Sequence, residues 1–331
     1  MGQARVRRAW GRASVPLTLI IPERDVAELI SMDEAVASVE EAFRRQARAE
    51  AVNSPRTRTR SSGSTLNAMH AILPYLGRGG MKCYMSSRKG TSFVFVLFDS
   101  ADSTPLAIMG ADTLGRYRTG AASGVATKFM YRGGSAILAV CGSGRQALTQ
   151  VQGVASVIQV PKVRAWSPAK AHREAFCSKL REIGIDSQAC ESPTEAVRGA
   201  DVLSTITSSR DAFLTGPRPP SLSHANICGS NRRDHAELSP ETLRGFETIA
   251  VDDLRQAMTE YGDLILASQA GEFSWDEAVG LDEIVSGGKR PAPPTLFKSG
   301  GVAVEDVAVA SLVYDKALRS DRRLHCDVEL K

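Results

Sequence analysis

The sequence predicts an α/β protein in which a doubly wound parallel sheet is joined to a smaller α+β unit. Three observations predict it: a glycine turn after an apolar strand at residues 136–147, alternating strand and helix patterns after Ser135, and β-prone segments separated by Gly and Ser over residues 53–110. Repeated strand–helix units of this length are typical of parallel sheets covered by helices. Ligands of such sheets bind beyond the carboxyl ends of the strands.

The glycine turn is the strongest local signal. The apolar run Ala136–Cys141 leads into Gly142-Ser143-Gly144-Arg145-Gln146-Ala147. Gly142 allows a tight turn, Gly144 lets the backbone approach a pyrophosphate, and Ala147 lets the next helix pack on the strand. The N-terminus of that helix offers free N–H groups to an anion. Glycines also mark simple turns, and the strand–helix succession behind this pattern favours dinucleotide binding.

The N-terminal part of the chain has a different pattern. Residues 1–16 are basic and are expected to be disordered, and Thr18–Ile21 is expected to be a short strand. Ser31 and Glu34 form a capping-box pattern that opens a helix from Met32 to about Arg48. The segments that follow predict a mostly antiparallel sheet, with a hairpin connection at Asp99–Ser103. These predicted strands are Met69–Pro74, Met81–Met85, Ser92–Asp99 and Pro105–Met109.

A helix over Gly110–Tyr131 carries a face of small residues, which permits close packing on another helix or on a cofactor. The strand–helix alternation follows it, and a final helix is long enough to pack back on the first unit. The predicted strands are Ala136–Cys141, Val163–Trp166, Ser187–Cys190, Asp201–Thr207, His224–Gly229 and Thr248–Asp252. The predicted helices are Lys170–Ile183, Pro193–Gly199, Leu254–Ser268 and Val302–Leu318.

Composition excludes several classes of protein. The net charge of +4 is small for 331 residues and partly lies in the N-terminal tail, so no nucleic-acid partner is expected. No segment approaches the ~20 apolar residues of a membrane span, so no membrane partner is expected. The six cysteines are scattered without a CxxC pair, which favours reduced thiols in a cytoplasmic protein and predicts no metal site.

The segment after the second parallel strand favours NADP(H) over NAD(H), which stays an alternative. An NAD site usually has an acid there for the ribose hydroxyls, but the first acid here is Glu174. Cationic and hydroxyl groups are available instead for a 2′-phosphate, although Lys170 and Arg173 also fit the solvated face of a helix. The predicted cofactor-binding residues are Gly142, Ser143, Gly144, Arg145, Gln146, Ser167, Lys170, Thr207, Ser208, Ser230 and Thr119.

Three cations outside the nucleotide fold are candidates for substrate chemistry: Arg56, Lys82 and Arg118. Each of them also fits a surface charge. Lys82 stands out because it lies within an apolar, strand-like run, and a buried lysine can shift its pKa and serve in acid–base chemistry. Arginine suits bidentate capture of a carboxylate.

These cations lie in motifs through which the chain resembles the ornithine cyclodeaminase/mu-crystallin family. The motifs follow the family's order and spacing over roughly residues 18–320. They are Pro55-Arg56-Thr57, Lys82, Arg118-Thr119-Gly120-Ala121-Ala122, the glycine turn at 142–147, Asn226-Ile227-Cys228-Gly229-Ser230-Asn231, Gly262-Asp263 and 297–306.

The resemblance implies a homodimer with two domains per chain. Residues 17–115 and 302–331 would form the substrate-binding and dimerisation domain, and residues 116–301 a Rossmann domain that binds NAD(P). It also implies that Arg56, Lys82 and Arg118 are catalytic and hold the carboxylate of a small 2-imino or 2-amino acid against the nicotinamide. Lys82 would also shuttle a proton. The predicted substrate-binding set is Arg56, Lys82, Arg118, Asn231 and Gly301.

One departure from the family decides between reactions. True cyclodeaminases have Asp where this chain has Asn231, and Asn cannot act as the base for ring closure. The leading hypothesis is therefore an NAD(P)H-dependent imine reductase or amino-acid dehydrogenase acting on a small 2-imino acid. One alternative is an ornithine cyclodeaminase that makes proline and ammonia with recycled NAD. The other, from a different class, is an NADPH-dependent protein that binds a small ligand, as mu-crystallin binds thyroid hormone.

Overall fold

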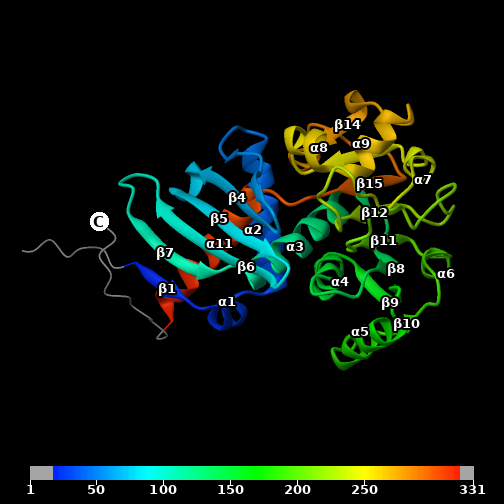
Figure 1. Cartoon of the computed structure of the whole chain (residues 1–331), viewed down its shortest axis with the longest axis horizontal. Helices are drawn as coiled ribbons and strands as arrows, with labels where there is room; N and C mark the ends of the chain where they lie inside the picture. Colours follow the sequence, from blue (N-terminus) through cyan, green and yellow to red (C-terminus); the bar gives the residue numbers. More distant parts are fainter. Residues whose placement is uncertain (1–17, 321–331) are drawn as a thin grey trace, which may run out of the picture.

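The computed structural model describes residues 18–320 and contains two sheets, each with its own helices (Figure 1). Residues 1–16, which are expected to be disordered, lie outside the described residues. Cys326 also lies outside them. The other five cysteines are free thiols. No helix within residues 18–320 is long and apolar enough to cross a membrane.

The smaller sheet has the order β1-β7-β6-β5-β4-β2, with β3 also paired to β4. Its strands are antiparallel except that β1 runs parallel to β7, so the predicted mostly antiparallel sheet is right. Sequence analysis missed β3, which is polar and largely exposed. The strands are β1 (Leu19–Ile21), β2 (Val52–Asn53), β3 (Thr57–Ser61), β4 (Ser64–Leu73), β5 (Arg78–Ser87), β6 (Gly90–Asp99) and β7 (Pro105–Gly110).

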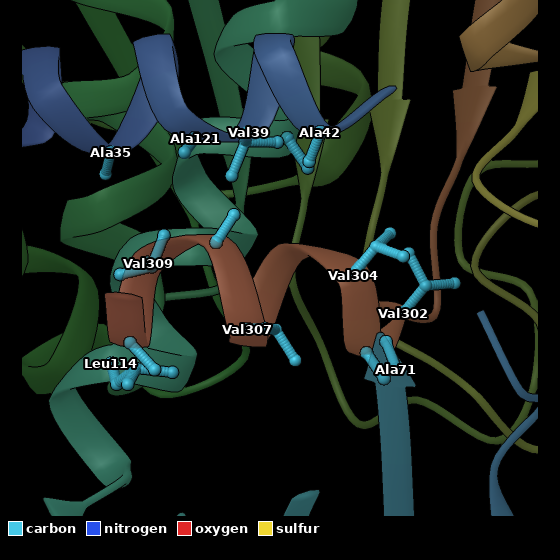
Figure 2. Packing of buried hydrophobic residues seen from close by; sticks show 14 of the residues in the cluster. Ala35, Val39, Ala42, Ala71, Leu114, Ala121, Val302, Val304, Val307 and Val309 are labelled. Carbon is cyan, nitrogen blue, oxygen red and sulfur yellow. The ribbon is translucent and has the colours of Figure 1, made fainter. Parts of the chain in front are cut away.

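Helix α11 (Ala303–Arg319) covers one face of this sheet, and α2 (Met32–Gln46) packs on α11. Figure 2 shows valines of α11 between alanines of α2 and Ala71 of β4. The C-terminal helix thus packs on the first sheet, as predicted. The hydroxyl of Ser31 accepts the N–H of Glu34, as the capping box requires. The short helix α1 (Glu23–Leu29) and the 3₁₀ turn η1 (Pro74–Leu76) were not predicted.

Helix α3 (Asp112–Met130) contacts both α2 and α4 (Ala147–Ala155). A Cβ atom at Gly120 would overlap the carbonyl of Thr149, and one at Gly153 would overlap the carbonyl of Gly120. The small-residue face of α3 therefore packs on another helix, which was one of the two interpretations that the sequence left open. The predicted boundary between residues 115 and 116 falls inside α3, and the division into domains stays a prediction.

The larger sheet has eight strands, all parallel, in the order β10-β9-β8-β11-β12-β15-β13-β14. The chain order reverses direction between β8 and β11, so the predicted doubly wound α/β fold is confirmed. The strands are β8 (Ser135–Cys141), β9 (Gln159–Trp166), β10 (Ser187–Ala189), β11 (Val202–Thr205), β12 (His224–Ile227), β13 (Thr248–Val251), β14 (Ala278–Gly280) and β15 (Thr295–Lys298).

One predicted helix of this unit was wrong, and two strands of the sheet, β14 and β15, were not predicted. The helix expected over 254–268 is two helices, α8 (Leu254–Glu260) and α9 (Gly262–Gln269). Tyr261 lies between them, and its buried hydroxyl donates to the carboxylate of Asp252. Strand β15 was not predicted, although it lies between β12 and β13. The remaining elements are α5 (Lys170–Glu182), α6 (Pro193–Val197), α7 (Pro240–Arg244), η2 (Trp275–Glu277) and α10 (Leu281–Val285).

Candidate functional site

The glycine turn lies at the carboxyl end of β8, where α4 begins. Gly142 has a φ of 113°, and a Cβ atom there would lie 2.6 Å from the carbonyl oxygen of Ile206, so the turn requires glycine at this position. Nothing lies within 4 Å of the Cβ position of Gly144. Ala147 is buried against the sheet. The turn therefore exposes backbone at a helix N-terminus, as phosphate binding needs.

The turn also lines a cavity of about 670 Å³ between α3, α4 and α5. Ser143, Gly144 and Arg145 line one end of it, and Lys179 and His172 line the side formed by α5. None of Arg56, Lys82 and Arg118 lines this cavity. The cavity therefore lies beside the turn and is separate from the cluster of cations described below.

The end of β9 is joined to the turn by a hydroxyl contact. Ser143 Oγ donates to Ser167 Oγ at 2.8 Å, which places Ser167 beside the phosphate-binding backbone. Lys170, at the start of α5, is exposed, and its ion pair with Glu174 is long at 3.9 Å. Both residues lie where a ribose 2′-substituent would lie in a dinucleotide-binding fold.

The two arginines of this region are engaged elsewhere. Arg145 forms an ion pair with Asp112 of α3, and its guanidinium lies 5.9 Å from the ring centre of Phe93. Arg173 is buried, donates to the Ser167 carbonyl at 3.1 Å, and pairs with Glu191. The interpretation of Arg173 as part of a solvated helix face is therefore wrong, and its internal partners leave it a structural role.

Lys82 lies on the inner face of β5 and is buried. Its Nζ lies 2.7 Å from Oδ1 of Asp306, in the first turn of α11. Burial lowers the pKa of Lys82 to about 8, with the nearby Arg118 adding to the effect and Asp306 opposing it. Lys82 therefore changes its charge close to neutral pH, as a group that exchanges protons in catalysis does.

Arg118 of α3 contacts the same acidic pair. Its Nη1 lies 2.8 Å from Glu305 and its Nε lies 3.1 Å from Asp306, and all three side chains are buried. The two acids raise the pKa of Arg118 against the effect of burial, so it is a permanent cation. Burial raises the pKa of Glu305 to about 8, although Arg118 opposes the rise.

Gly301 brings the third cation to this cluster. Arg56 donates to the carbonyls of Gly300 at 2.7 Å and Gly301 at 3.0 Å, and pairs with Glu260 at 3.1 Å. Gly301 has a φ of 78°, and a Cβ atom there would overlap the guanidinium of Arg118. Arg56, Lys82, Arg118 and Gly301, named here the cation cluster, therefore come together from four separate segments of the chain.

Asp252, after β13, fixes the Gly300–Gly301 segment. Its Oδ2 accepts the hydroxyl of Ser299 at 2.8 Å and the N–H groups of Gly300 at 3.2 Å and Gly301 at 2.8 Å. Sequence analysis assigned no role to this residue or to the acids Glu260, Glu305 and Asp306. Only Glu305 and Asp306 gave a signal, as adjacent acids within a family motif.

Asn231 lies on a loop that contacts the smaller sheet. Arg58 of β3 donates to the backbone carbonyl of Asn231 at 3.0 Å, to Asn67 at 3.2 Å, and pairs with Glu260. Asp234, the nearest acid in sequence, is exposed and contacts the His235 ring at 3.1 Å. Arg58 was missed by sequence analysis because it lies in a polar strand that looks like a loop.

The order of the strands determines what lies between the two parts of the site. The glycine turn follows β8, Gly300 and Gly301 follow β15, and the ends of β11 and β12 lie between them. Thr207 and Ser208 follow β11, while Ser230 and Asn231 follow β12. The predicted cofactor residues, with Asn231 and Gly301, thus follow strands along one edge of the larger sheet, except for Thr119, whose hydroxyl donates to the Gly115 carbonyl within α3. The three predicted cations come instead from the smaller sheet, its β2–β3 connection included, and from α3.

Among residues 18–320 there is no group of three or more His, Cys, Asp or Glu side chains that could hold a metal ion. The donors at this edge are backbone N–H groups, hydroxyls and cations. They suit an anionic organic cofactor and a carboxylate, and the exposed backbone at Gly144 leaves room for a pyrophosphate.

Known proteins are similar to this chain in sequence and in fold. The alanine dehydrogenase of Archaeoglobus fulgidus is 32% identical over 314 residues, covering 91% of this chain and 95% of the relative. The ketimine reductase mu-crystallin of Rattus norvegicus is 35% identical over 223 residues, covering 66% of this chain and 68% of the relative. The structure of Thermococcus litoralis Delta(1)-pyrroline-2-carboxylate reductase in complex with NADH and L-proline has a TM-score of 0.86 and 30% identity, covering 94% of this chain and 100% of that one.

A family model gives the same assignment over all of the described residues. The model of the ornithine cyclodeaminase/mu-crystallin family matches residues 18–321. The match confirms the family resemblance drawn from the motifs. The chain belongs to the ornithine cyclodeaminase/mu-crystallin family.

Proposed function

We propose that the protein is an NAD(P)H-dependent oxidoreductase that reduces small 2-imino acids to 2-amino acids. The observation that carries the proposal is the cation cluster at the sheet edge that also bears the glycine turn. In it, Arg56 and Arg118 lie against Gly301, and Lys82 joins Arg118 through the shared carboxylate of Asp306. Relatives named for ketimine, pyrroline-2-carboxylate and alanine chemistry support this substrate class.

The cluster suits a carboxylate next to a C=N bond. Arg118 offers a permanent, planar cation, and Lys82 offers a compact one beside it. Asp306 lies between both cations and orients them, while the lack of a side chain at Gly301 leaves room for the Arg118 guanidinium. A carboxylate bound to Arg118 and Lys82 holds the adjacent imine carbon in a fixed position, which supplies much of the rate enhancement.

The reduced nicotinamide supplies a hydride to the imine carbon. The nitrogen must gain one proton for the amine to form, and Lys82 is the buried cation of the cluster that can give one up. At neutral pH its Nζ carries the proton, because its pKa is lowered only to about 8. In the reverse direction the neutral side chain of Lys82 takes the proton back from the nitrogen of the amino acid. One residue therefore serves both directions of the reaction.

NADP(H) is the cofactor that we propose in preference to NAD(H). Ser167 and Lys170 lie at the end of β9 without an acid to accept the ribose hydroxyls. Fewer cations are available for a 2′-phosphate than the sequence indicated, because Arg145 and Arg173 pair with acids of this chain. Lys170 is therefore the cation on which this preference depends.

A homodimer is proposed from the outer face of the smaller sheet. This face is not covered by α2 or α11, and large apolar side chains on neighbouring strands are exposed on it, which is typical of an interface with another protein. Register pairs Leu66 with Met85, and Val52 with Ile72. The exposed apolar residues are Val52, Leu66, Ile72, Met81, Met85, Val94 and Phe98. A cytoplasmic location rests on the scattered thiols and stays a prediction.

Nothing at Asn231 favours the cyclodeaminase alternative. Asn231 supplies no carboxylate, its carbonyl is engaged by Arg58, and Asp234 is exposed and contacts His235. A protein that only stores a small ligand does not need three cations around one glycine. These observations place the reductase ahead of both alternatives.

The test is turnover with purified protein, NADPH and a panel of 2-imino acids: cyclic imines, and pyruvate or glyoxylate mixed with an amine. With at least one of these imino acids we expect NADPH to be oxidised and the matching amino acid to form. The loss of NADPH absorbance measures the oxidation. No oxidation with any imine would contradict the reductase. Formation of proline and ammonia from ornithine with catalytic NAD would establish the cyclodeaminase instead.

A further inference from the structure

Glu237 is a buried carboxylate in the segment after β12 that the proposed reaction does not use. It accepts four hydrogen bonds. Its Oε1 accepts the N–H of Thr207 at 2.8 Å and the hydroxyl of Thr207 at 2.7 Å. Its Oε2 accepts the hydroxyl of Thr205 at 2.7 Å and the N–H of Gly229 at 2.9 Å. One side chain thus joins the carboxyl ends of β11 and β12.

These two strand ends lie on the path between the parts of the site. The sheet order places β11 and β12 between β8, which carries the glycine turn, and β15, which leads to Gly301. A dinucleotide with its pyrophosphate on the turn has to cross both ends to bring its nicotinamide to the cation cluster. The segments that carry Thr207 and Gly229 would therefore support the nicotinamide half.

Glu237 is itself fixed from two further elements. Asp263, at the start of α9, accepts the N–H groups of Glu237 at 2.6 Å and Leu238 at 3.0 Å. The other oxygen of Asp263 lies 2.6 Å from Nζ of Lys298, at the end of β15. A Cβ atom at Gly229 would overlap both Glu237 and Thr207, so the contact leaves no free space. The Glu237 carboxylate is thus held rigidly relative to three neighbouring strands.

We propose that Glu237 is a positioning residue that sets the two strand ends beneath the nicotinamide, and so controls hydride transfer without contacting substrate or cofactor. The inference rests on the proposed function. Its chemical basis is that all four groups facing the carboxylate donate hydrogen bonds. A carboxylate can accept all of them, whereas an amide of the same shape cannot, because its NH₂ group has to face the N–H of either Thr207 or Gly229.

The test is Glu237→Gln, measured for kcat, for the dissociation constants of NADPH and 2′,5′-ADP, and for the fluorescence of bound NADPH. We expect kcat to fall about tenfold to a hundredfold, because a buried N–H loses its acceptor and one strand end moves. NADPH fluorescence should change, since it reports the surroundings of the nicotinamide. The affinity for 2′,5′-ADP, which lacks the nicotinamide, should stay within about twofold of wild type.

The matched control is Asp201→Asn, which makes the same change at the opposite edge of the sheet. Asp201 accepts the N–H of Ile137 at 2.8 Å, near the start of β8. The variant should leave all readouts within about twofold of wild type. If Glu237→Gln does not fold, Thr205→Val carries the test, because it removes one of the four donors from a buried site. It should shift kcat and NADPH fluorescence in the same direction by a smaller factor.

Two results would overturn the inference. One is an equal loss of affinity for NADPH and 2′,5′-ADP, which is general damage to the domain. The other is unchanged kcat and unchanged NADPH fluorescence in the folded variant. Both binding readouts are independent of turnover. If the wild-type protein binds NADPH but reduces no imino acid, the proposed function fails while the effect of Glu237 on the bound nicotinamide can still be measured.

Discussion

The glycine turn and the cation cluster are built in opposite ways. The turn comes from six consecutive residues and presents backbone to open space at Gly144. The cation cluster comes from four segments, and Arg56, Lys82 and Arg118 each form an ion pair with a buried acid. The residues that form the turn are consecutive in sequence, whereas the residues of the cluster meet only when the chain is folded. The turn should therefore control dinucleotide binding, and the cluster should control turnover.

The largest expected effect is the separation of these two roles by Lys82→Ala. We expect turnover to fall at least about a thousandfold, because both charge and proton are lost, while NADPH affinity changes little. Folding should persist because Asp306 keeps its contact with Arg118 at 3.1 Å. Steady-state kinetics and NADPH titration measure the two quantities. Lys89→Ala, an exposed lysine in the turn after β5, is the control. Retention of turnover by Lys82→Ala would show that its assigned role is wrong.

A pair of glycine substitutions sharpens the comparison. Gly142→Ala places a Cβ atom against the Ile206 carbonyl at a positive φ, so NADPH should bind about tenfold to a hundredfold more weakly. Gly301→Ala pushes on the Arg118 guanidinium, so it should reduce kcat/KM for the imino acid and spare NADPH affinity. Titration with NADPH and initial rates distinguish them. Gly134→Ala, with open space around it, is the control. The same defect in both variants would contradict the division of roles.

The pH dependence tests the charge of Lys82. Its ammonium form exists below its pKa of about 8 and is lost as pH rises through that value. We therefore expect kcat/KM, which reports the free enzyme, to fall above about pH 8. The limb in kcat should lie at higher pH, because the bound carboxylate adds a negative charge beside Lys82. Lys82→Arg, whose side chain stays charged, should lose this limb from whatever activity it keeps. A profile that is flat to pH 10 would contradict the account.

The smallest expected effect concerns the 2′-phosphate. Lys170→Ala should raise the KM for NADPH by about threefold to tenfold and leave that for NADH unchanged, because an exposed lysine contributes a partly screened charge. The control is Lys289→Ala, an exposed lysine in the loop before β15 that does not line the cavity beside the turn. Initial rates measured with NADPH and with NADH give the KM for each cofactor and hence the ratio of the two KM values. Equal effects on NADPH and NADH would remove the support for an NADP(H) preference.

The contrast between the regions also explains what the sequence could predict. The turn, six of the eight parallel strands and the capping box are local patterns, and they were predicted correctly. Lys82 could be singled out because a lysine in an apolar strand is unusual. Its partner Asp306, 224 positions away, could not be assigned, because no local pattern reports which acid a buried cation meets. The break at Tyr261 was missed as well, because its contact with the buried carboxylate of Asp252 forms only in the folded chain.

The most direct test of the central claim follows the hydride itself. The wild-type protein is incubated with NADPH carrying deuterium at the transferable C4 position and with the imino acid that supports turnover. The amino acid formed is then analysed by mass spectrometry and NMR. Direct reduction at the cation cluster predicts one deuterium per molecule, bound to the α-carbon. An amino acid product without deuterium, formed while NADPH is consumed, would contradict hydride transfer from the nicotinamide to the imine carbon.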